Sequence, residues 1–180
     1  MLNVFIPERE YYDGVTETFI TTPARSLVLE HSLVAISKWE SKWMKPFLGK
    51  NSKTNEEIYD YIRCMIIGDD CDMFTLRNMP QTELDKITNY IQSSSTATTI
   101  TQSKDSKPSR EIITSELIYY WMVAFNIPFE CQHWHLNRLL TLVNICNIKN
   151  SPPKKQSPRE TLSRNAALNA ARKKAMKTSG

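Results

Sequence analysis

Cysteine and histidine residues stand close together at one place in the chain, in the run Cys131-Gln132-His133-Trp134-His135. Structural zinc sites use thiolate and imidazole ligands in pairs spaced about two to five residues apart. On a helix, Cys131 and His135 share a face, whereas His133 points elsewhere. Cys146 follows 15 residues after Cys131, which is about 22 Å along a straight helix at ~1.5 Å per residue. Because these side chains do not converge, we predict that they serve packing and that no metal is bound.

Other residue patterns that carry chemistry are incomplete. Asp69, Asp70 and Asp72 form an acidic run, but the remaining ligands and the closing glutamate of a calcium loop are missing. No catalytic spacing links a serine with a histidine and an acid. The chain has only four glycines, which argues against a glycine-rich phosphate loop. We therefore expect neither an enzyme nor a cofactor.

Four tryptophans are interleaved with tyrosines in the apolar parts of the chain. Such rings can stack on bases or contact a protein partner, but their helical spacing is also typical of core residues. Both interpretations stay open. The candidate partner-binding residues are these tryptophans and the basic side chains near them or in the tail: Trp39, Trp43, Trp121, Trp134, Arg138, Lys154, Lys155, Arg164, Arg172, Lys173 and Lys174.

The charge is divided unevenly along the chain. Residues 151–180 hold eight Lys or Arg and one acid, a net charge of +7, so residues 1–150 carry −3 of the overall +4. A basic tail of this kind can contact nucleic acid, an acidic protein surface or the acidic body of a neighbouring copy. The alternative is a helix that only improves solubility.

The hydrophobic pattern predicts a mainly α fold of the α+β class: a small helical domain with a short N-terminal antiparallel β element and a basic C-terminal helix. Residues 2–30 contain short β-branched and aromatic runs separated by Asp13-Gly14 and Pro23, which indicates two or three strands. Helices are expected where apolar residues recur with the helical period and where capping residues precede them. Their predicted ranges are 33–44, 54–67, 82–92, 115–126, 130–147 and 158–176.

Two of these helices are predicted to form the centre of the fold. Nearly every face of 115–126 is apolar, so we expect it to be the central buried helix, antiparallel to 130–147. Gly68 is expected to close the helix at 54–67. Pro152 and Pro153 break the chain after the last body helix.

These signals divide the chain into an N-terminal β element (1–30), a helical body (31–150) and a basic tail (151–180). A Ser/Thr-rich stretch at 93–110 is expected to be a loosely held loop. The longest apolar run has nine residues, about half of what a membrane span requires. The N-terminus does not resemble a secretory signal, so we expect a cytoplasmic protein with reduced cysteines.

Several segments resemble a family of tailed-bacteriophage proteins known as tail assembly chaperones. The segments are LEHSLVAISKWESKWMKPFL, DYIRCM, TATT, IITSELIYYWMVAFNIPFECQHWHLNRLLTLVNICNIKN and RNAALNAARKK. The similarity runs from about residue 27 to the C-terminus, and residues 112–150 are its longest part.

This resemblance implies a small helical, non-enzymatic protein of the infected host's cytoplasm that is not part of the mature virion. Its partner would be the long tape measure protein, which it keeps soluble while tail tube subunits assemble. In the family, a longer frameshifted product is thought to recruit those tube subunits, and Lys173-Lys174 is compatible with a slippery codon run. Self-association is expected, and neither a membrane nor nucleic acid is an expected partner.

Two other functions remain as alternatives. The chain could be a structural virion protein, such as a neck or minor tail component. It could also be a nucleic-acid-binding accessory protein that uses the basic tail.

Overall fold

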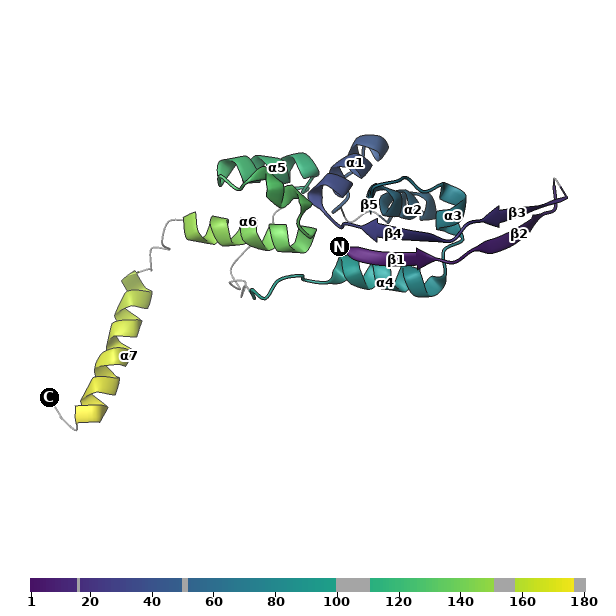
Figure 1. Cartoon of the computed structure of the whole chain (residues 1–180). Helices are drawn as coiled ribbons and strands as arrows, with labels where there is room; N and C mark the ends of the chain where they lie inside the picture. The colour runs from purple at the N-terminus through teal and green to yellow at the C-terminus, as the bar shows by residue number, and fades with distance from the viewer. Residues whose placement is uncertain (16, 50–51, 100–110, 151–157, 177–180) are drawn as a thin grey trace. The chain divides into compact units, whose positions relative to one another are not determined.

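A computed structural model describes residues 1–15, 17–49, 52–99, 111–150 and 158–176. Its contacts divide the chain into one unit at residues 1–147 and a second at 148–180. The fold is α+β and mostly helical, as the sequence predicts (Figure 1). The strands are β1 (Leu2–Ile6), β2 (Arg9–Asp13), β3 (Thr18–Thr22), β4 (Arg25–Leu29) and β5 (Ile66–Ile67). The helices are α1 (Leu33–Trp43), α2 (Asn55–Cys64), α3 (Met73–Arg77), α4 (Gln81–Gln92), α5 (Ser115–Ala124), the 3₁₀ helix η1 (Phe129–His133), α6 (Leu136–Asn150) and α7 (Pro158–Met176).

The first four strands form one long antiparallel hairpin with a constant register. Leu2 pairs with Leu29 at its base, and Asp13 pairs with Thr18 near its turn. The ladder is interrupted around Pro7 and Pro23, because proline has no N–H to donate. The outer half, β2 and β3, extends past the helices as a two-stranded arm (Figure 1). The expected N-terminal antiparallel element is therefore confirmed, but it has four strands, β1 to β4, rather than two or three.

The end of the second helix differs from the prediction. We expected a helix to residue 67 closed by Gly68, but α2 ends at Cys64 with Met65 as its C-cap. Ile66 and Ile67 instead form β5, which pairs antiparallel with Val28 and Leu29 of β4. Two adjacent β-branched residues favour an extended backbone, and the free edge of β4 offers them hydrogen bonds.

Local capping signals locate the starts of α1 and α5 correctly. The Ala35 N–H donates to Ser32 Oγ at the start of α1 (3.4 Å), and the Leu117 N–H donates to Thr114 Oγ1 at the start of α5 (3.4 Å). The short helix α3 was not predicted; it begins directly after the acidic run, and Asp72 of that run is its N-cap.

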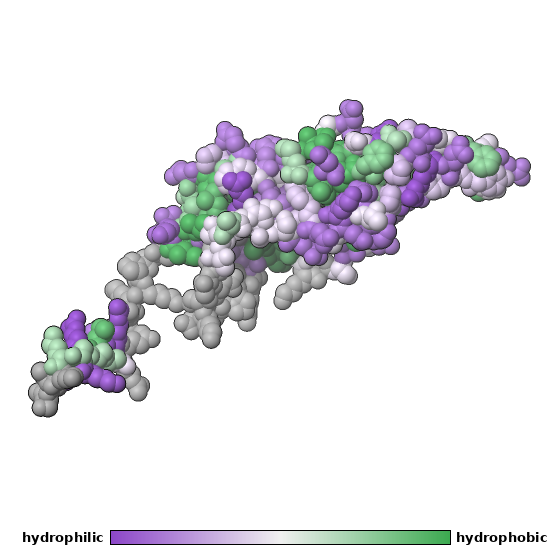
Figure 2. All heavy atoms as spheres, turned by 60° about the horizontal axis from the view of Figure 1, so that its bottom comes forward, coloured by the Kyte–Doolittle hydropathy of each residue, from purple (hydrophilic) through white to green (hydrophobic). Residues whose placement is uncertain are grey.

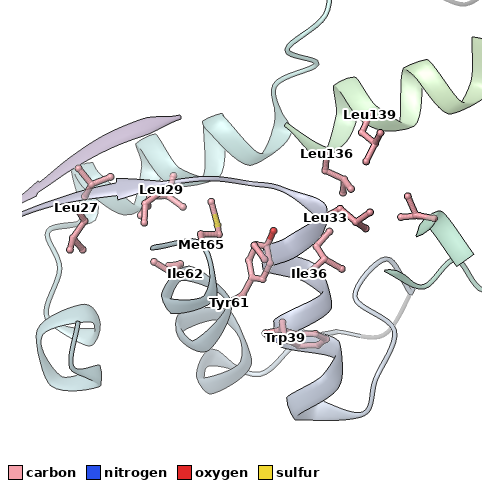
Figure 3. Close-up of a cluster of buried hydrophobic side chains, with 14 of the residues drawn as sticks. Leu27, Leu29, Leu33, Ile36, Trp39, Tyr61, Ile62, Met65, Leu136 and Leu139 are labelled. Atoms are coloured by element: carbon pink, nitrogen blue, oxygen red, sulfur yellow. The ribbon is translucent and has the colours of Figure 1, made fainter. Parts of the chain in front are cut away.

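The core is centred on α1 rather than on α5. Leu33, Ile36 and Trp39 of α1 are buried, and they meet side chains from β4, α2 and α6 (Figure 3). By contrast, α5 packs mainly against α1 and leaves Tyr120 and Val123 exposed. The prediction that 115–126 is the central buried helix is therefore wrong. A helix that is apolar on every face can still lie at the surface when only one of its faces finds a partner.

The predicted partner of that helix also differs. Residues 129–133 form η1, and α6 begins only at Leu136, so 130–147 is not one continuous helix. Pro128 precedes η1, and the extended backbone of Trp134 separates the two helices. Both α5 and η1 pack on α1, and the Tyr119 hydroxyl of α5 donates to Gln132 Oε1 of η1 (3.0 Å). The two predicted segments are therefore in contact, but not as a pair of continuous helices.

Only part of the predicted loop at 93–110 lies within the described residues, and residues 93–99 contain no helix or strand. Within the described ranges, no helix combines the length and the apolar character needed to cross a membrane.

Candidate functional site

A groove with a volume of about 230 Å³ lies between α2 and α4. Tyr61, Ile62 and Ile87 form its buried floor, and Asn55 and Thr88 add polar groups. The more accessible apolar side chains of the groove are Ile58, Tyr59, Leu84 and Ile91. Most of its lining residues are apolar, and it has the character of a surface that receives a partner's apolar side chains.

The spacing of apolar residues on the two helices creates this groove. Ile58 and Ile62 are one turn apart on α2, while Leu84, Ile87 and Ile91 follow the helical period on α4. The two helices therefore direct apolar stripes toward the same hollow. Ile58 remains 44% exposed, so the hollow is accessible to a partner.

The start of α2 is held firmly by its capping box. The Thr54 N–H donates to Glu57 Oε2 (2.8 Å), and the Glu57 N–H donates to Thr54 Oγ1 (3.3 Å). Lys45 Nζ donates to Glu57 Oε1 (2.6 Å). The hydrogen bond from Lys45, together with the backbone hydrogen bond at Thr54, lowers the pKa of Glu57. The carboxylate is thus charged at neutral pH and fixes the helix that forms one wall of the groove.

Charges of both signs lie beside the groove. Glu56 and Asp85 are exposed and stand next to the lining residues Asn55 and Leu84 in the sequence, and the exposed Lys86 stands next to Ile87. Arg77 forms an exposed ion pair with Glu56 (3.1 Å), which contributes little stability. An amphipathic helix with an apolar stripe and polar flanks matches a groove of this kind.

A buried polar cluster lies behind the groove floor. His31 Nδ1 and the Tyr61 hydroxyl share a hydrogen bond of 2.5 Å, and the His31 and His135 rings are 4.9 Å apart. Burial, with a smaller contribution from His135, lowers the pKa of His31 to about 4. Burial also raises the pKa of Tyr61 well above its usual value. Both groups are therefore neutral at pH 7, and we interpret the cluster as a positioning element that joins β4, α2 and α6.

The tryptophans proposed for partner binding have different surroundings. Trp39 is a core residue with 1% of its surface exposed, and its Nε1 donates to the Glu57 carbonyl (2.8 Å). It cannot contact a partner without unfolding. Trp43 is half-buried, and its Nε1 donates to Asp60 Oδ2 (2.8 Å). Trp121 is also half-buried and packs against the core.

Trp134 and Arg138 are brought together by the structure. The guanidinium carbon of Arg138 lies 3.9 Å from the centroid of a Trp134 ring, in cation–π geometry. Both residues line a hollow of about 360 Å³ with Thr96, Leu142 and Ile145. The i, i+4 spacing of Trp134 and Arg138 anticipates their contact even though Trp134 precedes α6.

The basic candidates of the tail belong to the C-terminal unit. Arg164, Arg172, Lys173 and Lys174 are exposed on α7. Lys154 and Lys155 lie outside the described residues. The tail candidates that are described thus lie together on one helix, as predicted from the proline and the capping pattern at its start.

The cysteine and histidine run does not assemble into a metal site in the described part of the chain. Cys131 is buried in the core. His133 Nδ1 lies 3.2 Å from Glu30 Oε1, and His135 Nε2 contacts the Tyr90 carbonyl at 2.9 Å. These imidazoles link separate elements of the fold.

Sequence reasoning missed the groove between α2 and α4. The apolar spacing of each helix was visible, but the spacing alone does not tell which residues are covered by the rest of the fold. It also missed the exposed aromatic surface of α5, whose residues were expected to be buried. Comparisons of this chain with protein-family models, with curated proteins and with solved structures find no match.

Proposed function

We propose that this protein is a non-enzymatic tail assembly chaperone of a tailed bacteriophage. It binds the tape measure protein in the cytoplasm of the infected host and keeps it soluble while tail tube subunits assemble. The resemblance of the segments from about residue 27 to the C-terminus supports this family. The apolar groove between α2 and α4 is the structural observation that carries the proposal.

The groove fits a helical client with an apolar stripe. Ile58, Leu84 and Ile91 offer accessible apolar side chains, and residues spaced by about one turn on a client helix could enter between them. A hollow of about 230 Å³ supports a weak contact rather than a tight one. Weak contacts repeated along a very long client allow many copies to bind one chain and to leave it again during assembly.

Co-expression with the tape measure protein tests this proposal. Ile58→Glu places a charge in the groove at a residue that is 44% exposed, so the variant is expected to fold. We expect the amount of soluble, co-purified client to fall by about tenfold, because a charge in an apolar contact costs more than 1 kcal/mol.

Ile67→Glu is the matched control. Ile67 is 43% exposed and lies in β5, outside the groove. It should keep the client soluble as the wild type does. The proposal is wrong if Ile58→Glu retains full client binding, or if the wild type does not co-purify with the tape measure protein at all.

The exposed arginines and lysines of α7 favour one second candidate, a nucleic-acid-binding accessory protein. Arg164 and Arg172 stand two turns apart on the same side of the helix, a spacing that could follow phosphates. Binding of this kind should weaken steeply with salt. DNA binding with such a salt dependence, without client binding, would replace the chaperone proposal. Detection of the protein in purified virions would instead favour a neck or minor tail component.

A further inference from the structure

The outer side of α5 and the start of η1 form an exposed aromatic surface, which we call the α5 face. It consists of Tyr120, Val123 and Phe129, which are 65%, 60% and 54% exposed. Tyr120 and Val123 are one turn apart on α5. The Phe129 ring lies 6.4 Å from the ring of Tyr119, so η1 extends the surface of the helix. Large apolar groups gathered at this exposure mark an interaction site.

The α5 face has an acidic border. Glu116 precedes Tyr120 by one helical turn, and Glu130 follows Phe129 directly; both are exposed. The segment 111–137 contains glutamates but no lysine or arginine. A partner for this face therefore needs apolar side chains with positive charges beside them, because such a partner gains both apolar burial and charge complementarity.

The helix α7 has this chemistry. Residues 158–176 carry five basic side chains and one acid, and the described side chains from Leu162 to Met176 are exposed. Arg164, Leu168 and Arg172 follow one another at four-residue intervals, so they form a basic–apolar–basic row on one side of the helix. An isolated helix of this length is marginal in water and gains stability from a packing surface.

We propose that the α5 face of one copy binds the α7 helix of a second copy. Leu168 would pack on the aromatic side chains of the face, and Arg164 and Arg172 would lie near Glu116 and Glu130. The contact joins two different surfaces, so a pair of copies keeps one free face and one free helix, and association proceeds head to tail into rows or rings. This inference does not depend on the identity of the client.

The β2–β3 arm is another acidic surface and a competitor for α7. It carries Glu10, Asp13 and Glu17, and Tyr12 and Phe19 are exposed. In Figure 2 a hydrophobic patch lies near the end of the arm among hydrophilic residues. We favour the α5 face because it belongs to the packed body, whereas a two-stranded arm is a weaker platform for a helix. The arm therefore provides the matched control.

Sedimentation velocity of the full-length protein at rising concentration tests the proposal. The wild type is expected to self-associate. Glu116→Lys with Glu130→Lys on the face, or Arg164→Glu with Arg172→Glu on the helix, should each weaken association by about tenfold, as two exposed ion pairs become repulsive. Tyr120→Ala with Val123→Ala, which leaves the charges unchanged, should weaken it as well. Circular dichroism checks that every variant is folded.

Charge exchange and mixing make the test specific. All four reversals in one chain should restore association. A mixture of the face variant with the helix variant should associate again in an alternating order, because both contacts between unlike copies are complementary whereas contacts between like copies are repulsive. Glu10→Lys with Glu17→Lys on the arm should have no effect. The proposal would be overturned if the wild type or the mixture stays monomeric. It would also be overturned if the combined reversals fail to restore association, or if the arm variant loses association.

Discussion

The carboxylate of Glu40 in α1 accepts a hydrogen bond of 2.7 Å from the backbone N–H of Ser115, although 75 residues separate the two positions. The other oxygen of Glu40 accepts from the Phe47 N–H (2.6 Å). Glu40 therefore holds the first residue of α5 and the segment after α1 with one buried side chain. This link fixes the place where α5 begins, and with it the position of the α5 face.

The first prediction concerns this link. Glu40→Ala should lower the free energy of unfolding by about 3 kcal/mol, because two N–H groups lose their acceptor and one of them is in a buried hydrogen bond. Urea unfolding measures the change. Glu56→Ala, which removes an exposed carboxylate, is the control and should change stability by less than about 0.5 kcal/mol. Equal effects of the two substitutions would contradict this role of Glu40.

The second prediction is a loss of stability between pH 7.5 and pH 5. The pKa of His31 falls from about 6.5 to about 4 on folding, so its neutral form is favoured in the folded state. Its contribution is fully present above pH 6.5 and is lost as the pH falls toward 4, because the unfolded chain takes up the proton first. At pH 5 the loss amounts to about 2 kcal/mol. The pKa of His135 is also lowered by burial, so it acts in the same direction.

Urea unfolding at several pH values tests this dependence. His31→Phe should be less stable than the wild type at pH 7.5, since the Tyr61 hydroxyl loses its partner. However, the variant should lose clearly less stability than the wild type between pH 7.5 and pH 5. An unchanged pH slope in His31→Phe would show that His31 is not the group responsible.

The third prediction is that chelation with EDTA leaves the melting temperature unchanged. Cys131 is buried, and the imidazoles of His133 and His135 contact Glu30 and the Tyr90 carbonyl. Structural zinc contributes folding free energy directly, so its removal would lower the melting temperature by many degrees. Such a drop would show that the run from Cys131 to His135 has been misinterpreted.

The fourth prediction concerns the tail. Deleting residues 151–180 should leave a single cooperative melting transition, because the contacts of residues 1–147 form a compact unit of their own. The deletion should also abolish the concentration-dependent association proposed above. Loss of the cooperative transition would mean that the tail is part of the core.

Features that depend on nearby residues could be predicted from the sequence. Ser32, Thr54 with Glu57, and Thr114 start their helices through hydrogen bonds to residues three positions away. Such caps are local and do not depend on the rest of the fold. The charge of the tail likewise follows from its composition, and the mainly helical class follows from the helical spacing of the apolar residues.

The tertiary structure alone decided which apolar surfaces are buried. Trp39 and Tyr120 both lie in aromatic helical segments, yet one is in the core and the other is exposed. Ile66 and Ile67 follow a helix but join β4, since pairing with its edge outweighs their place in the helical pattern. The groove and the α5 face arise in the same way. Burial depends on partners far away in the sequence, such as Glu40 for Ser115, and no local pattern contains them.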